Sequence, residues 1–175
     1  MNLPNLLSLF RLFITVFFIL LVVYGHFGLA LFLFVLQALS DLLDGFFARR
    51  MGEKTNLGAY LDPLADKVML ASSYIVLCVE KIVPLWLVAT VLLRDVVISI
   101  GFLILLKRGL TMDPVPSLIS KATTVFQMLT IVYVLAFGAR GFYWFFFYTT
   151  ALLTIVSGIQ YIFSGWSTFC RKEIV

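Results

Sequence analysis

Six apolar stretches of membrane-spanning length divide this chain, and they constrain its fold more than any other feature. A helix that crosses the hydrocarbon core of a bilayer needs about 20 mostly apolar residues. Stretches of this kind occupy residues 6–24, 27–47, 57–79, 83–106, 118–137 and 142–163. Of the 175 residues, 62% are hydrophobic and 13% are charged, whereas soluble domains have about 45–50% and about 25%. The sequence therefore predicts an all-α membrane protein, with six transmembrane helices in a single domain, residues 1–175.

The basic residues predict how these helices are oriented. With six spans, both termini lie on the same side of the membrane. Of the 13 lysine and arginine residues, Lys81 and Arg140 fall on one side and the other 11 on the opposite side. Basic residues accumulate on the cytoplasmic side of membrane proteins, so we expect both termini in the cytoplasm. The net charge of +4 favours contact with anionic lipid headgroups and not with nucleic acid.

Four carboxylates interrupt the second and third apolar stretches. Asp41 and Asp44 lie near the cytoplasmic end of the second predicted helix, and Asp62 and Asp66 near the start of the third. A charge in hydrocarbon costs at least about 2.5–3.5 kcal/mol. Spacings of three and four residues put each pair on one helix face, and the short connection makes the two helices antiparallel neighbours. We expect the two faces to converge on a site that opens toward the cytoplasm.

The chemistry of such a site follows from its ligands. Carboxylate oxygens suit Mg²⁺, Mn²⁺ or Ca²⁺, and four carboxylates are enough for two ions about 3.5–4 Å apart, as in two-metal phosphoryl transfer. Arg49, about one turn beyond Asp44, can reach a phosphate. One alternative is structural ion pairing of the aspartates with basic residues, namely Arg49, Lys67 and Arg94. Another is a cation transporter, although no polar track crosses the membrane and no inverted repeat is visible.

The carboxylate run also carries a resemblance. From Asp41 to Asp66 the chain reads Asp-x2-Asp-Gly-x2-Ala-Arg-x8-Gly-x3-Asp-x3-Asp, which resembles at every position the signature of the CDP-alcohol phosphotransferases, six-helix membrane enzymes of phospholipid synthesis. The N-terminal segment from Asn2 to Arg11 is similar to that of the family. The segment Leu61-Asp-Pro-Leu-Ala-Asp-Lys67 is similar to the branch that makes phosphatidylglycerol phosphate and cardiolipin.

This resemblance implies a reaction and a role for each motif residue. CDP-diacylglycerol would bind with its pyrophosphate on Mg²⁺ or Mn²⁺, an acceptor hydroxyl would attack the phosphate next to the lipid, and CMP would leave. The metal ligands implied are Asp41, Asp44, Asp62 and Asp66, with Asp66 also the general base. The residues implied for CDP binding are Asp41, Gly45, Ala48, Arg49 and Gly58. The resemblance further implies a homodimer in a bacterial inner membrane, with its active site facing the cytoplasm.

The acceptor is the open question. The basic residues predicted to bind a phosphorylated acceptor are Arg94, Lys107, Arg108 and Lys121, although Lys107 and Arg108 suit interface anchoring equally well. Sequence neighbours on a helix point about 100° apart, so we expect Arg94 and Asp95 not to pair directly.

Two acceptors remain in contention. Ser120-Lys-Ala-Thr-Thr124 departs from the Gly-Lys-x-Lys-Thr pattern of phosphatidylglycerol phosphate synthases, and with Arg94-Asp-Val it looks closer to cardiolipin synthases, which use phosphatidylglycerol. Glycerol 3-phosphate is the acceptor of the more widespread activity. We therefore expect phosphatidylglycerol phosphate synthesis, with cardiolipin synthesis as the alternative.

Overall fold

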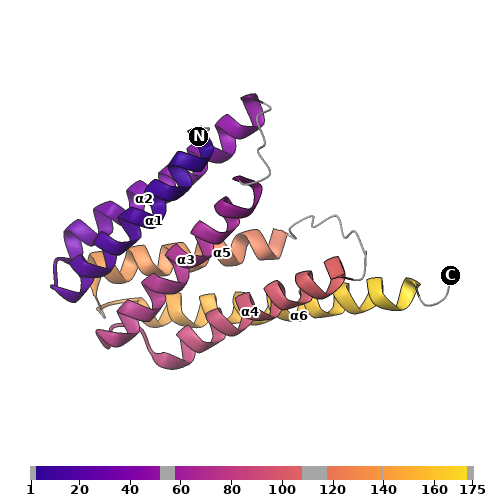
Figure 1. Cartoon of the computed structure of the whole chain (residues 1–175). Helices are drawn as coiled ribbons and strands as arrows, with labels where there is room; N and C mark the ends of the chain where they lie inside the picture. The colour runs from indigo at the N-terminus through magenta and orange to yellow at the C-terminus, as the bar shows by residue number, and fades with distance from the viewer. Residues whose placement is uncertain (1–2, 52–57, 108–117, 139, 173–175) are drawn as a thin grey trace. The chain divides into compact units, whose positions relative to one another are not determined.

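The computed structural model describes residues 3–51, 58–107, 118–138 and 140–172, with side chains described for residues 10–40, 65–101, 118–138 and 140–164. Every regular element in these ranges is an α-helix (Figure 1). The helices are α1 (Leu3–Val23), α2 (Phe27–Met51), α3 (Gly58–Val79), α4 (Leu85–Lys107), α5 (Leu118–Phe137) and α6 (Tyr143–Lys172). The all-α class and the six helices predicted from the apolar stretches are confirmed.

Two helix ends show the same turn with different residues. After α1, Gly25 takes φ 75°, and the His26 amide donates to the Leu21 carbonyl oxygen over 2.8 Å. After α3, Lys81 takes φ 59°, and the Ile82 amide donates to the Leu77 carbonyl oxygen over 2.9 Å. This is the left-handed cap that usually requires glycine. Lys81 therefore holds a conformation that is strained for an L-residue.

The first of two compact units comprises Met1–Pro84 and Ile131–Gly141. Within it α1 contacts both α2 and α3. The core between α1 and α2 includes the buried rings of Phe18 and Phe34, whose centroids lie 5.8 Å apart. Further buried side chains come from α3, among them Met69, Tyr74 and Leu77. Helix α1 is therefore the packing partner of both helices that carry the aspartate motif.

The second unit comprises Leu85–Thr130 and Phe142–Val175. Within it α4 and α6 contact each other and run side by side (Figure 1). Its buried apolar residues include Leu87 and Val91 of α4, and Phe147 and Ala151 of α6. The first part of α5 belongs to this unit and its last two turns to the first unit. The single domain over residues 1–175 stays a prediction.

Membrane-spanning character can be judged only for the residues whose side chains the structure describes. Within these residues, two stretches are long and apolar enough to cross a bilayer, Leu118–Phe137 of α5 and Tyr143–Ser164 of α6. Among the residues with described side chains, the apolar stretches Phe10–Val23 of α1 and Phe27–Ser40 of α2 are shorter. The count of six spans and the cytoplasmic position of the termini stay predictions.

Candidate active site

Asp66, the last carboxylate of the motif, forms an ion pair with Arg11 of α1. The Arg11 Nη1 atom donates a hydrogen bond to Asp66 Oδ1. Arg11 is almost completely buried, at 1% exposure, whereas 34% of the Asp66 side chain stays exposed. A buried guanidinium without a counter-charge strongly destabilises a fold. The Asp66 carboxylate supplies counter-charge to Arg11, and the ion pair fixes Asp66 against α1.

Gln37 of α2 binds the same turn of α1. Its Nε2 atom donates to the Arg11 carbonyl oxygen over 2.9 Å and to Thr15 Oγ1 over 3.0 Å. Thr15 donates its own hydroxyl proton to the Arg11 carbonyl oxygen over 2.8 Å, so its oxygen is left to accept from Gln37. All three residues are buried. Gln37 lies one helical turn before Asp41, so this contact joins the motif-bearing half of α2 to α1.

Neither Arg11 nor Gln37 stood out in the sequence as a site residue. Arg11 counted there only as a basic residue of the cytoplasmic side and as part of the family-like N-terminal segment. One signal was available, because a charged residue inside an apolar stretch must find a counter-charge. The sequence could not show that its partner is Asp66.

The remaining motif residues can be placed only by their backbone. Asp41, Asp44, Gly45, Ala48 and Arg49 belong to α2, and Gly58 and Asp62 belong to α3 with Asp66. Their side chains, apart from that of Asp66, lie outside those that the structure describes. Among the described residues, no group of three or more potential metal ligands occurs. The metal and CDP sites therefore stay predictions, supported by helical backbone at both aspartate pairs.

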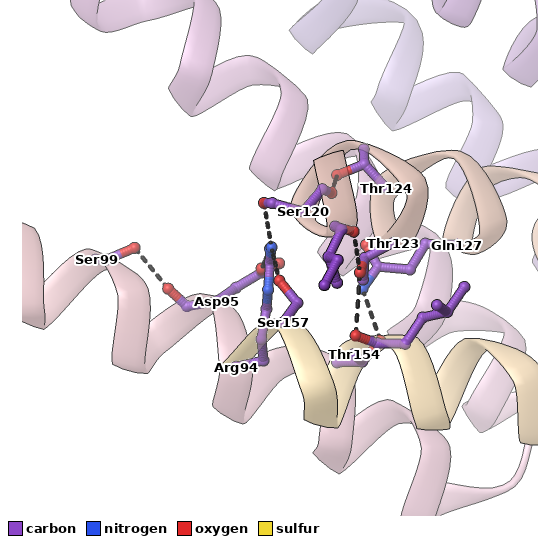
Figure 2. Close-up of polar contacts among 11 residues, drawn as sticks. Arg94, Asp95, Ser99, Ser120, Thr123, Thr124, Gln127, Thr154 and Ser157 are labelled. Atoms are coloured by element: carbon purple, nitrogen blue, oxygen red, sulfur yellow. Dashed lines mark hydrogen bonds and ion pairs between the residues drawn. The ribbon is translucent and has the colours of Figure 1, made fainter. Parts of the chain in front are cut away.

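A second polar cluster surrounds Arg94 of α4 (Figure 2). Arg94 Nη1 donates to Asp95 Oδ1 over 2.8 Å, and Nη2 donates to Ser120 Oγ over 2.7 Å and to Ser157 Oγ over 2.9 Å. The side chains of Arg94 and Asp95 are only 10% and 15% exposed. The guanidinium thus links α4 to α5 and α6 within the second unit.

The expectation that Arg94 and Asp95 do not pair is wrong. Their Cα–Cβ bonds diverge around the helix, but the arginine side chain is long enough to bring its Nη1 atom back to the neighbouring carboxylate. Burial favours this geometry, because each charge would otherwise lack compensation. Within the described part of the chain Arg94 therefore has a counter-charge of its own, distinct from the motif aspartates.

Small residues let α6 approach α4 closely. A Cβ atom added at Gly158 would lie 3.6 Å from Arg94 Cγ, which is ordinary van der Waals contact. A Cβ atom at Gly101 would lie 3.1 Å from Tyr161 Cε1, which is tighter than most real contacts. Close backbone approach through small residues is typical of helix packing in membranes. The position of Ser157 opposite Arg94 depends on this packing.

Polar side chains also join α5 to α6 (Figure 2). Thr123 Oγ1 donates to the Leu153 carbonyl oxygen over 3.1 Å, and Gln127 Nε2 donates to Thr154 Oγ1 over 3.3 Å. One turn further on, the hydroxyls of Thr130 and Thr150 lie 2.7 Å apart. These contacts hold α5 in register with α6, and so hold Ser120 where it meets Arg94.

The four predicted acceptor-binding residues are described to different extents. The Arg94 side chain is part of the cluster above and is largely buried, and Lys121 follows Ser120 on α5 with an exposed side chain. Lys107 ends α4, but its side chain lies outside those described, and Arg108 lies outside the described residues altogether. Arg94 and Lys121 are therefore the two candidates that the structure places, both in the second unit.

Comparison with known proteins identifies the family. The sequence model of the CDP-alcohol phosphatidyltransferases matches residues 1–156. Two similar bacterial proteins are named CDP-diacylglycerol–glycerol-3-phosphate 3-phosphatidyltransferase. The one from Aquifex aeolicus is 41% identical over 135 residues, covering 75% of this chain and 74% of the relative. The one from Escherichia coli is 34% identical over 174 residues, covering 92% and 93%.

A third relative carries a different name. The probable cardiolipin synthase (CMP-forming) of Drosophila melanogaster is 30% identical over 199 residues, covering 97% of this chain and 59% of the fly protein. The family model covers most of the chain, including the aspartate motif on α2 and α3. This chain belongs to the CDP-alcohol phosphatidyltransferase family.

Proposed function

We propose that this protein transfers the phosphatidyl group of CDP-diacylglycerol to glycerol 3-phosphate, giving phosphatidylglycerol phosphate and CMP. Family membership supports phosphatidyl transfer, and the two bacterial relatives are named for this acceptor. One structural observation carries the proposal. Asp66 closes the family's motif on α3, and its carboxylate is anchored by buried Arg11 while a third of it stays exposed. A substrate can reach this carboxylate.

We further propose that the six helices span a bacterial inner membrane, with the motif at the cytoplasmic side. Large apolar side chains are exposed along one face of α1, at Phe13, Phe17 and Leu20. They are also exposed along α6, at Leu152, Ile159 and Phe163. Contact with water at these faces would be unfavourable, whereas lipid chains can cover them. The uneven distribution of basic residues supports the orientation.

The donor chemistry of the motif fits divalent cations, because hard ions such as Mg²⁺ and Mn²⁺ prefer carboxylate oxygens. In this proposal, Asp41, Asp44, Asp62 and Asp66 hold one or two ions. Bound there, the ions supply positive charge beside the pyrophosphate and the departing CMP. Gly45, Ala48, Arg49 and Gly58 hold the cytidine nucleotide.

The covalent step exchanges one bond to phosphorus for another. The acceptor hydroxyl oxygen bonds to the phosphorus next to the diacylglycerol, and its proton passes to the Asp66 carboxylate. The bond from that phosphorus to the bridging pyrophosphate oxygen breaks, and the bond's electron pair leaves with CMP. A positioned carboxylate is a suitable general base, and its tether to α1 limits the directions in which it can point.

Arg94 and Lys121 are the residues we propose for acceptor binding. A guanidinium has five N–H donors, and three of those of Arg94 are engaged by Asp95, Ser120 and Ser157. The Nε donor is buried and has no partner among the described residues. Arg94 thus keeps donor capacity for an anionic group, and exposed Lys121 adds a second positive charge. A phosphorylated acceptor suits this combination.

Cardiolipin synthesis is the second candidate function. The fly relative named as a probable cardiolipin synthase covers nearly all of this chain. Ser120 also has a defined role, because its hydroxyl accepts a hydrogen bond from Arg94, and this serine belongs to the pattern shared with that branch. In this case, the hydroxyl of phosphatidylglycerol attacks in place of glycerol 3-phosphate.

The test is a side-by-side assay of the purified protein in detergent micelles. CDP-diacylglycerol and Mg²⁺ or Mn²⁺ are supplied with glycerol 3-phosphate, with phosphatidylglycerol, or with no acceptor, and CMP and lipid products are identified by mass spectrometry. We expect CMP and phosphatidylglycerol phosphate with glycerol 3-phosphate only. Treatment with a chelator should stop the reaction, and added metal should restore it. The absence of CMP release with either acceptor and either metal would rule out the proposed function.

A further inference from the structure

We propose that Arg11 is a positioning residue for phosphatidyl transfer and that Gln37 holds it in place, an inference that rests on the proposed function. Arg11 contacts the Asp66 carboxylate through its guanidinium and Gln37 through its carbonyl oxygen. One residue of α1 therefore binds both helices that carry the aspartate motif. Its role is to keep the Asp66 carboxylate at a fixed place relative to the aspartates of α2.

The helix contacts support this role. Helix α1 packs against both α2 and α3, so the separation of the two motif halves depends on it. Gln37 precedes Asp41 by one turn, and Asp66 follows Asp62 by one turn. The hydrogen-bonded group of Arg11, Thr15, Gln37 and Asp66, called the Arg11 node below, therefore lies close to both aspartate pairs along their helices. A change in this node alters the geometry of the motif without removing any of its ligands.

The node is also held in one arrangement. Arg11 and Gln37 are each 1% exposed, and Thr15 is 3% exposed, which leaves little room for water to replace their contacts. The Gln37 amide has only one acceptable orientation, because a flip would turn its Oε1 atom toward the Arg11 carbonyl oxygen. In the present orientation, Oε1 has no partner among the described residues, but both amide donor contacts are made.

The expected effect concerns turnover more than substrate binding. Misplacement of a reacting group by about 1 Å can reduce a rate about 100-fold. We expect Arg11→Gln to lower kcat about 100-fold and to leave the KM for CDP-diacylglycerol within about threefold. Arg11→Lys keeps the charge but lacks the planar fork of a guanidinium. The kcat of Arg11→Lys should therefore be about tenfold higher than that of Arg11→Gln.

Gln37→Met tests whether Gln37 holds Arg11 in place. Methionine fills a similar volume but cannot donate to the Arg11 carbonyl oxygen or to Thr15. We expect kcat to fall about tenfold. Ser73→Ala is the matched control on α3, because the buried Ser73 hydroxyl donates only within its own helix, to the Met69 carbonyl oxygen over 2.7 Å. This control should keep the wild-type kcat.

The ion pair itself has a readout that does not depend on activity. Asp66→Asn removes the negative charge of Asp66 from beside the buried Arg11 guanidinium, which destabilises the protein. Adding Arg11→Gln removes that buried charge. The double variant should therefore lose less in its midpoint of thermal unfolding than the two single losses added together, with unfolding followed by tryptophan fluorescence in detergent. Strictly additive losses from the two substitutions would show that the residues do not pair.

The outcomes separate the inference from the proposed function. A wild-type protein that releases no CMP would overturn the proposed function, while the stability comparison would still test the pair. An active wild type with an Arg11→Gln variant as fast as Ser73→Ala would overturn the inference alone. The inference also fails if the loss of activity merely tracks the loss of folded, monodisperse protein in gel filtration and Arg11→Lys rescues nothing.

Discussion

Arg94 and Ser157 join α4 to α6 through a 2.9 Å hydrogen bond from Nη2 to Oγ. The residue after Ser157 is Gly158, and its backbone lies against the aliphatic part of the same arginine. The guanidinium and its stem thus both contact one turn of α6. Because Asp95 and Ser120 hold the other side, the orientation of Arg94 is determined by three helices of the second unit.

Replacement of Arg94 by lysine should weaken acceptor binding. Lysine keeps a charge beside Asp95 but cannot bind Ser120 and Ser157 in the same fork geometry. Hydrogen bonds to charged groups contribute about 1.5–3 kcal/mol, so the KM for glycerol 3-phosphate should rise about tenfold or more. Initial rates at varied acceptor concentration measure this. Thr90→Val is the control on α4, since Thr90 donates only to the Trp86 carbonyl oxygen. An unchanged acceptor KM would remove Arg94 from the acceptor site.

Replacement of Asp66 by asparagine should stop turnover and largely keep nucleotide binding. The amide has nearly the shape of the carboxylate but cannot take up the acceptor proton. Loss of a general base typically lowers a rate by about 10²–10⁴-fold. CMP release measures the rate, and equilibrium binding of CDP in the presence of Mn²⁺ measures the nucleotide site. If this variant retains substantial turnover, Asp66 is not the base.

Replacement of Lys81 by glycine should stabilise the protein. Lys81 has φ 59° at the end of α3, a conformation that costs an L-residue about 1–2 kcal/mol and costs glycine little. We expect a gain of about 1 kcal/mol in the free energy of unfolding, measured by titration with a denaturing detergent. Glu80→Gly is the control, because Glu80 lies in the same turn without a positive φ. A loss of stability in Lys81→Gly would contradict the strain at this residue.

Two glycines of the α4–α6 contact should respond differently to alanine. At Gly158 the new Cβ atom meets Arg94 at an ordinary contact distance, whereas at Gly101 it presses on the Tyr161 ring. Overpacking typically costs about 1–3 kcal/mol. Gly101→Ala should therefore be the less stable of the two by about 1 kcal/mol in the same unfolding titration. Equal stabilities would mean that the tyrosine ring moves aside at little cost.

The helices were largely predictable, because each apolar stretch has the length and composition of one helix. The predicted and the observed helices differ at their ends. The apolar stretches end at residues 47 and 163, but α2 continues to Met51 and α6 to Lys172. A hydropathy pattern ends where polar residues begin, whereas the backbone hydrogen bonds of a helix continue through residues such as arginine and lysine, which are good helix formers.

The candidate site was predictable only in part. The motif spacing assigned Asp66 to one face of a helix, since that follows from helix periodicity alone. It did not indicate that Arg11, 55 residues earlier, is its partner, nor that Gln37 fixes the same turn. The pairing of Arg94 with Asp95 was also missed, because the directions of two Cβ atoms do not reveal where a long side chain ends.

The amino-acid sequence by itself determined the six helices, the spacing of the aspartate motif and the family resemblance that the comparisons bear out. These features depend on hydrophobicity and on separations along one chain. The tertiary structure alone decided that α1 lies against both motif-bearing helices and that Arg11 meets Asp66. A buried charge such as that of Arg11 must be compensated, but the sequence offers several acidic residues as counter-charges. Only the packing of the helices brings Asp66 within reach of Arg11.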